Sequence, residues 1–336
     1  MREGVTFADV LIVPKYSNIE SRLEIDVASK YLGGWRVPII SAPMDTLSGP
    51  RMVAALSDAN AYGILHRFGE PEKLKQNAYE ARLLNEKGHF GISIGVKDFD
   101  STRLWLDSVG SAHIHSVCVD VAHGHHQLVI DTIKRLKEWM WQNNYSWHII
   151  AGNVATGDGF WALASAGADA IRVGIGSGSA CTTRGMTGVG VPQLTALMDC
   201  VEAQAGYPNV ALIADGGIQS PGDICKALAA GADAVMLGKM LAGSDESNAP
   251  VDSLNHRVYR GQSLNGSNGA RGAPEGIQGI IDNTGPVKET VERLMHYLRS
   301  SMSYVGARNL KEFRERVEFI KVSPATQQES QTRLGV

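Results

Sequence analysis

The stretch Ala166-Gly167-Ala168-Asp169-Ala170-Ile171-Arg172-Val173 is the most informative for the fold, because its opening motif occurs twice in the chain. The first five residues return unchanged as Ala230-Gly231-Ala232-Asp233-Ala234, 64 positions later. Each copy follows a helix-like segment, which glycine is suited to end, and leads into an apolar run typical of a buried strand. The motif therefore predicts two equivalent helix-to-strand junctions within one repeating architecture.

Eight short apolar runs extend this pattern along the chain, and amphipathic segments typical of helices separate several of them. Strands joined through helices form parallel βαβ units, and eight such units predict a closed (β/α)8 TIM barrel of the α/β class. An open doubly wound sheet is the alternative, which is disfavoured because no early G-x-G-x-x-G follows a first strand. The predicted strands are residues 37–42, 62–65, 91–96, 116–121, 148–153, 170–174, 210–214 and 234–237, and the predicted helices include 49–60, 127–142, 159–166 and 221–230.

One barrel domain is expected over residues 1–323, with a short flap at about 262–275 after the eighth strand. Residues 324–336 form a polar tail that is expected to be disordered.

The composition narrows the class of protein. A chain of 336 residues with 43% hydrophobic and 20% charged residues is typical of a soluble globular protein, and its net charge of −3 favours neither nucleic acid nor a membrane as partner. No run of 18 apolar residues predicts a membrane span, and Met1-Arg2-Glu3-Gly4 does not open a signal peptide. The four cysteines form no C-x-x-C pair, so we expect a cytoplasmic protein without disulfides or a zinc site.

A glycine-rich loop follows the strand at 170–174 and ends in a cysteine, two hydroxyls and a guanidinium: Gly174-Ile175-Gly176-Ser177-Gly178-Ser179-Ala180-Cys181-Thr182-Thr183-Arg184. Glycines let the backbone approach an ion closely, and backbone N–H groups with a nearby arginine favour the nucleophilic thiolate form of a cysteine. A tight turn around a buried cysteine is the alternative interpretation. The rest of the chain favours a reactive cysteine.

Polar residues gather where the predicted strands end, at 41–46, 66–67, 120–124, 152–153, 215–217 and 238–239. TIM barrels carry their chemistry at this end of the strands and often hold a phosphate after strands seven and eight. Gly216, Gly217, Gly238 and Lys239 have the composition and position of such a site. We therefore favour a pocket for a nucleoside monophosphate over ordinary turns.

Two longer motifs resemble the signature of the IMP dehydrogenase and GMP reductase family. They are Gly176-Ser177-Gly178-Ser179-Ala180-Cys181-Thr182-Thr183-Arg184 and Thr187-Gly188-Val189-Gly190-Val191-Pro192-Gln193. Residues 6–14, 41–46, 214–218, 259–261 and 304–307 also match, so the resemblance covers roughly residues 5–323.

The resemblance implies a chemistry and a set of site residues. In this family a cysteine attacks C2 of a purine nucleotide, and a hydride moves between C2 and a nicotinamide. Cys181, Thr183 and Glu275 match the catalytic residues. The substrate-binding positions are Ser41, Met44, Asn153, Ser179, Asp215, Gly216, Gly217, Gly238, Lys239, Tyr259, Gly261, Gln262, Ser263 and Gly276. The cofactor-binding positions are Ser21, Arg22, Arg67, Asp120, Val121, Ala122 and Arg184, and the potassium-binding positions are Gly176, Gly178 and Cys181.

Within these sets, Asp215 matches the residue that holds the ribose, and Glu275 the residue that bonds the purine edge. Ser21 and Arg22 match a contact to the cofactor tail, made across a subunit boundary in the homotetramer that the resemblance implies. The phosphate positions are Ser179, Gly216, Gly217, Gly238, Lys239 and Tyr259.

The direction of the reaction depends on what the chain lacks. Only about 30 residues separate Leu65 from Gly95, too few for an inserted pair of CBS domains, and residues 262–274 contain no Arg-Tyr pair to activate water. We therefore favour GMP reductase using NADPH. An IMP dehydrogenase using NAD is the alternative, because residues 189–192 and 274–279 resemble that enzyme more closely. A catalytically silent purine-binding barrel is a third hypothesis, which the intact Cys181, Thr183 and Glu275 disfavour.

Four positions depart from the family pattern: Arg67 replaces a lysine, Ser177 a proline, Lys239 a small residue and Gln262 a methionine. They leave a deoxynucleotide or an altered purine open as substrate. The cluster His123-Gly124-His125-His126 has no evident further ligand, so surface or cofactor-loop histidines are favoured over a metal site.

Overall fold

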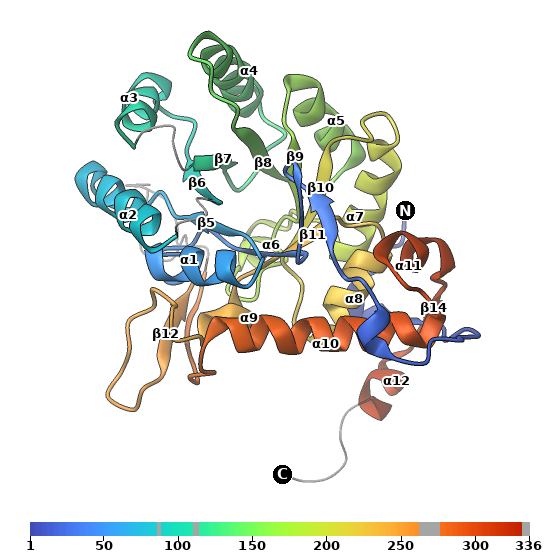
Figure 1. Cartoon of the computed structure of the whole chain (residues 1–336). Coiled ribbons are helices and arrows are strands. Elements are labelled where there is room, and N and C mark those ends of the chain that lie inside the picture. The colour runs from blue at the N-terminus through green and yellow to red at the C-terminus, as the bar shows by residue number, and fades with distance from the viewer. Residues whose placement is uncertain (86–88, 110–113, 262–275, 331–336) are drawn as a thin grey trace.

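A parallel barrel forms the centre of the molecule (Figure 1). The computed structural model describes residues 1–85, 89–109, 114–261 and 276–330. The eight strands pair in the order β4-β11-β10-β9-β8-β7-β6-β5, and a parallel bridge between Ile40 and Tyr62 closes the circle. Their bounds are β4 Ile39–Ser41, β5 Gly63–Leu65, β6 Phe90–Ile94, β7 Ile114–Asp120, β8 His148–Val154, β9 Ala170–Val173, β10 Ala211–Asp215 and β11 Ala234–Leu237. The predicted TIM barrel is confirmed, and each predicted strand overlaps one of the eight.

Helices pack around the outside of the barrel and bury their apolar faces against the strands (Figure 1). The longer ones are α1 Pro50–Asp58, α2 Pro71–Leu84, α3 Phe99–Val109, α4 Gln127–Gln142, α5 Gly157–Ala166, α7 Gln193–Gln204, α8 Pro221–Ala229 and α10 Val287–Val305. The shorter ones are η1 Phe7–Asp9, η2 Arg22–Glu24, α6 Thr183–Thr187, α9 Lys239–Ala242, α11 Leu310–Arg316 and α12 Pro324–Glu329. Among the helices of the described residues, none has the length and apolar character needed to cross a membrane.

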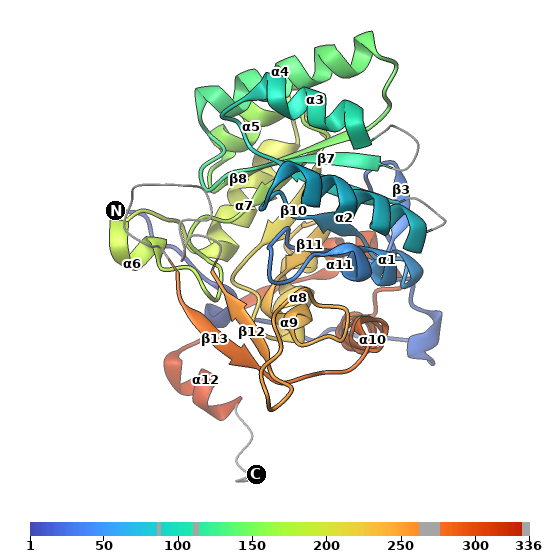
Figure 2. The same cartoon turned by 90° about the vertical axis from the view of Figure 1, so that its left-hand side faces the viewer.

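Three two-stranded sheets complete the fold. β1 (Val10–Ile12) pairs with β14 (Phe319–Lys321), and β2 (Ser29–Tyr31) pairs with β3 (Gly34–Arg36). β12 (Arg257–Arg260) and β13 (Gln278–Ile281) form a ribbon beside α9 (Figure 2).

The expected disorder of the tail is wrong for residues 324–329, which form α12. Proline at the first position of a helix fits the fixed backbone angle there, and Pro324 begins this one. Gln327 Nε2 also donates a hydrogen bond to the Ala8 carbonyl at 3.1 Å, so the helix is tied to the N-terminal segment. Residues 331–336 lie outside the described residues.

The repeated motif places the same junction before β9 and β11. Gly167 and Gly231 both adopt positive φ, at 107° and 115°. Asp169 then accepts a hydrogen bond from the Ile149 amide at 2.7 Å, and Asp233 accepts one from the Leu212 amide at 2.8 Å. Each aspartate thus ties the start of its strand to the strand preceding it in sequence.

A histidine cluster lies where β6, β7 and β8 begin. The ring of His115 lies 5.3 Å from that of His89 and 5.0 Å from that of His148, between centroids. Arg36 Nη2 is 3.4 Å from His115 Nε2, and the Tyr62 hydroxyl is 3.3 Å from its Nδ1. Burial and the neighbouring Arg36 lower the pKa of His115 to about 3, and burial also lowers the pKa of His148.

We expect this cluster to destabilise the fold in acid. The unfolded chain binds a proton at His115 near its ordinary pKa of 6.5, whereas the folded chain does so only near 3. The unfolded state therefore binds more protons between these values, and the free energy of unfolding falls as the pH drops from about 6.5 towards 3. Urea denaturation of His115→Gln at several pH values should show a weaker acid dependence than the parent. His296→Gln, at an exposed position of α10, is the control and should match the parent; equal slopes in all three proteins would refute the assignment.

Candidate active site

A cavity of about 280 Å³ opens at the carboxyl ends of the barrel strands, between the glycine-rich loop, β7, β8, β10 and β12. It brings together most of the predicted site residues. Those that line it are Met44, Arg67, Asp120, Val121, Ala122, Asn153, Gly176, Gly178, Ser179, Cys181, Thr183, Asp215, Gly216, Tyr259 and Gly261.

Other predicted residues lie outside the cavity lining. The Ser41 hydroxyl is buried in the barrel, where it accepts a hydrogen bond from Ser48 at 2.6 Å. Arg184 donates to the carbonyls of Ile175, at 3.1 Å, and of Val191, so it braces the loop from behind. The remaining described positions outside the lining are Ser21, Arg22, Gly217, Gly238, Lys239 and Gly276. Gln262, Ser263 and Glu275 fall outside the described residues.

Cys181 is the only exposed cysteine of the four. Its Sγ lies 3.2 Å from Thr183 Oγ1, and its amide donates to the Gly178 carbonyl at 3.0 Å. Burial raises the pKa of the other three thiols, to about 12 for Cys118, about 12 for Cys200 and about 11 for Cys225. Because the thiolate is the reactive form, Cys181 is the cysteine suited to nucleophilic chemistry.

The glycine-rich loop is held against the end of β10 by hydrogen bonds to backbone carbonyls. Gly217 donates its amide to the Ser177 carbonyl at 2.8 Å, and the Ser177 hydroxyl donates to the Asp215 carbonyl at 3.1 Å. Gln193 Nε2 bonds the same carbonyl at 3.2 Å and the Val173 carbonyl at 2.7 Å. These hydrogen bonds join the loop that carries Cys181 to the strand that carries Asp215.

At Gly174 the backbone of the loop lies closest to the backbone of Asp215 at the end of β10. A Cβ at this position would stand 1.9 Å from the Asp215 carbonyl oxygen, and φ is 145°. Gly174→Ala should therefore lower the free energy of unfolding by about 3 kcal/mol or more, as measured by urea denaturation. Gly185→Ala is the matched control, because a Cβ there meets nothing within 4 Å and the residue lies in α6. A loss for Gly174→Ala no larger than that of Gly185→Ala would contradict the close approach.

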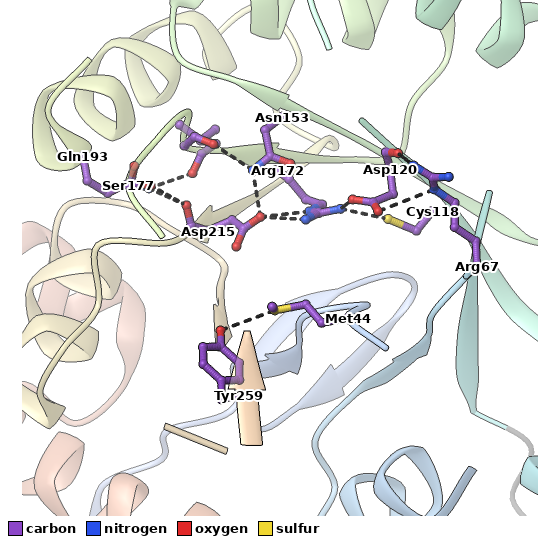
Figure 3. A network of polar contacts seen from close by, with 12 residues as sticks. Met44, Arg67, Cys118, Asp120, Asn153, Arg172, Ser177, Gln193, Asp215 and Tyr259 are labelled. Atoms are coloured by element: carbon purple, nitrogen blue, oxygen red, sulfur yellow. Dashed lines mark hydrogen bonds and ion pairs between the residues drawn. The ribbon is translucent and has the colours of Figure 1, made fainter. Parts of the chain in front are cut away.

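The two carboxylate oxygens of Asp215 differ in their contacts: Oδ2 accepts hydrogen bonds from Asn153 and Arg172, and Oδ1 does not (Figure 3). Oδ2 accepts from Asn153 Nδ2 at 2.7 Å and from Arg172 Nε and Nη2 at 3.1 and 2.8 Å. Within the described part of the chain, Oδ1 has no hydrogen-bond partner, and Asp215 lines the cavity. A charged acceptor so placed suits ligand hydroxyls.

Asp120 lies at the end of β7, on the other side of Arg172 from Asp215 (Figure 3). Its Oδ1 accepts from Arg172 Nη1, and Arg67 Nε lies 3.7 Å from its Oδ2. Arg67 Nη2 also donates to the Asp120 carbonyl at 3.2 Å. The arginine that departs from the family pattern therefore holds Asp120 in place.

Sequence reasoning missed Arg172 and Phe68, which also line the cavity. Arg172 stands within β9, in a run otherwise typical of a buried strand, and only 6% of its surface is exposed. A lone arginine in such a run was the available signal, because a buried cation requires partners of opposite charge.

Tyr259 reaches the cavity from β12. Its hydroxyl lies 3.4 Å from Met44 Sδ and close to Gly238, where a Cβ would stand 2.5 Å from it. Burial raises the pKa of Tyr259 to about 12, although contact with Ser179 opposes the shift. The residue is therefore a neutral donor, suited to an anionic group beside Gly238 and the exposed Lys239.

Within the described residues, no group of three or more His, Cys, Asp or Glu side chains could hold a metal ion. In the segment His123-Gly124-His125-His126, His126 caps α4, because its ring accepts a hydrogen bond from the Leu128 amide at 3.1 Å.

Comparisons with known proteins extend over the whole chain. The IMP dehydrogenase / GMP reductase domain model matches residues 4–333. GMP reductase from Onchocerca volvulus is 34% identical over 348 residues, which cover 97% of this chain and 93% of that protein. Inosine-5'-monophosphate dehydrogenase from Aquifex aeolicus is 40% identical over 275 residues, which cover 76% of this chain and 55% of that protein. A variant of GMP reductase from Trypanosoma brucei, crystallised with guanosine 5'-monophosphate, has a TM-score of 0.89 at 27% identity, covering 100% of this chain and 98% of that chain.

Proposed function

Because the chain belongs to the IMP dehydrogenase / GMP reductase family and is an oxidoreductase, we propose that it reduces GMP to IMP and ammonia with NADPH. The observation that carries the proposal is the cavity in which the exposed Cys181 faces a hydroxyl, an aspartate with an open oxygen and a glycine-rich loop. The match to GMP reductases over nearly their full length supports this direction of the reaction.

We place the nucleotide in this cavity with its ribose against Asp215. Asp215 Oδ1 accepts hydrogen bonds from the ribose hydroxyls. The phosphate lies beyond it, against the amides of Gly216 and Gly238, with the Tyr259 hydroxyl as a further donor. Gly217 belongs to the same turn, but its amide is already bonded to the Ser177 carbonyl. Cys181 then lies under the purine. Backbone amides at glycine turns suit a phosphate because they donate without steric obstruction.

The chemistry begins at Cys181. Its thiolate adds to C2 of guanine, and the bond from C2 to the exocyclic nitrogen breaks, so ammonia leaves. Thr183, whose oxygen is 3.2 Å from the sulfur, passes a proton to the leaving nitrogen together with Glu275. The nicotinamide supplies the hydride that C2 then accepts, after which the thiolate departs and IMP remains. Thiolate is suited to both roles because it adds and leaves readily.

The cofactor side of the cavity is formed by Asp120, Val121, Ala122 and Arg67. These residues suit a nicotinamide mononucleotide end, because a braced carboxylate and the exposed Ala122 line the same cavity as Cys181. Ser21 and Arg22 lie on η2 against α10, away from this cavity. We assign them to the cofactor tail of a neighbouring subunit in a cytoplasmic homotetramer.

We also assign a potassium ion to the carbonyls of Gly176, Gly178 and Cys181. Hard cations prefer oxygen ligands, and glycines allow several carbonyls to converge.

An IMP dehydrogenase using NAD is the second candidate, because the identity over the shared barrel is higher, at 40%, to the Aquifex aeolicus dehydrogenase. The experiment that decides is the nicotinamide absorbance of the purified protein in potassium buffer, with GMP and NADPH in one cuvette and IMP and NAD in another. Loss of NADPH with formation of IMP and ammonia supports the reductase. A rise of NADH with formation of XMP overturns it in favour of the dehydrogenase, and no change in either cuvette overturns both.

A further inference from the structure

Arg172 lines the cavity and forms a bridge between Asp215 and Asp120 (Figure 3). It lies on β9, and its guanidinium reaches Asp215 at the end of β10 through Nε and Nη2, at 3.1 and 2.8 Å. Its third nitrogen, Nη1, donates to Asp120 at the end of β7 and lies 3.5 Å from Cys118 Sγ. One buried cation therefore contacts both the aspartate proposed for the nucleotide and the aspartate proposed for the cofactor.

The charges around this bridge balance. Asp215 and Asp120 supply two negative charges, and Arg172 and Arg67 supply two positive ones. Burial opposes the charge of Arg172, but the two aspartates outweigh it and raise the pKa of Arg172 well above its ordinary value. Arg172 is thus a permanent cation whose position is set by both carboxylates at once.

We infer that Arg172 is a positioning residue that couples nucleotide binding to cofactor binding, an inference that rests on the proposed function. The ribose hydroxyls fix Asp215, which holds two nitrogens of the rigid guanidinium. The third nitrogen then fixes Asp120 for the cofactor. Whichever ligand binds first orders part of the site for the second, so each raises the affinity for the other by the same factor.

The geometry of the guanidinium is what this role requires. Its nitrogens lie in one plane at fixed angles, so contacts to Asp215 and Asp120 constrain each other. A lysine ammonium is a single point charge on a flexible chain and holds one carboxylate at a time. Arg172→Lys therefore keeps the charge of the network and removes the rigid connection.

The test is isothermal titration of the full-length protein with GMP and with NADP⁺, each alone and in the presence of the other. NADP⁺ cannot supply a hydride, so no IMP forms and binding is measured without turnover. In the parent we expect each ligand to tighten the other at least about fivefold. In Arg172→Lys we expect this factor to fall to about one. A parent without coupling, or a variant that keeps it, overturns the inference.

Arg67→Lys is the matched control, because Arg67 contacts Asp120 but not Asp215. It should change cofactor affinity and keep the coupling factor, and loss of coupling in this variant would also overturn the role of Arg172. If Arg172→Lys does not fold, Asp120→Asn breaks the same connection at its other end and should also abolish coupling. Turnover of the parent is scored separately, so failure of the proposed function is distinguishable from failure of the coupling.

Discussion

Alanine at position 181 is expected to reduce kcat by about 10⁴-fold or more, because no other exposed thiol is available to attack the purine. The nucleotide should still bind within about threefold of the parent affinity, since Asp215 and the glycine amides hold its ribose and phosphate. Steady-state kinetics give the first quantity and isothermal titration with GMP gives the second. This combination separates a nucleophile from a residue that only shapes the pocket.

Cys200→Ala is the matched control. Cys200 is buried on α7 and contacts the Thr156 carbonyl at 3.5 Å, away from the cavity. Its replacement should leave kcat unchanged, although the melting temperature falls. Residual activity of Cys181→Ala above about 1% of the parent would show that the reaction proceeds without the covalent step.

Replacing Asp215 by asparagine is expected to raise the KM for the nucleotide by about 100-fold. Hydrogen bonds to a charged acceptor are worth about 1.5–3 kcal/mol each, and the neutral amide weakens those to the ribose hydroxyls. The substitution also leaves Arg172 with one carboxylate instead of two. Steady-state kinetics over a wide nucleotide range measure this change.

Asp223→Asn tests whether the effect belongs to the site. Asp223, like Asp215, is an aspartate near the end of β10, but it lies in the first turn of α8. Its Oδ2 accepts hydrogen bonds from the amides of Gln219 and Ser220 at 3.0 Å each. Its replacement should lower the free energy of unfolding by about 1 kcal/mol and leave KM unchanged. A KM for Asp215→Asn within about threefold of the parent would place the ribose elsewhere.

The sequence predicts the barrel well because its signals are local. Buried parallel strands are short apolar runs, and helices show their own period, so all eight strands and α4, at Gln127–Gln142, are found. Strand ends differ by a few residues, since the apolar run at 37–42 continues beyond the hydrogen-bonded pairs of Ile39–Ser41. The missed helix α12 has no buried residue. It begins at a proline and is held by a tertiary contact, which a hydrophobic pattern does not report.

The site is predicted where motifs state it and missed where the fold assembles it. Cys181 and Thr183 stand together in the sequence, and the structure keeps them 3.2 Å apart. Asp120 and Asp215 were expected from the resemblance, but Arg172 was not, because only closure of the barrel brings its guanidinium between the two carboxylates. Ser41, expected at the substrate site from the resemblance, lies outside the cavity lining, and its hydroxyl accepts a hydrogen bond from Ser48.

The two aspartates of the repeated motif stabilise the barrel at the end opposite to the candidate active site. Asp169 and Asp233 fasten neighbouring strands at the rim where those strands begin, whereas Cys181, Asp120 and Asp215 lie at the opposite rim. Substitutions can therefore accumulate in the loops around the site during evolution, while the contacts at the other end of the barrel preserve the fold. Reductases and dehydrogenases can diverge on such a scaffold through changes confined to loops, without passing through an ancestor that fails to fold.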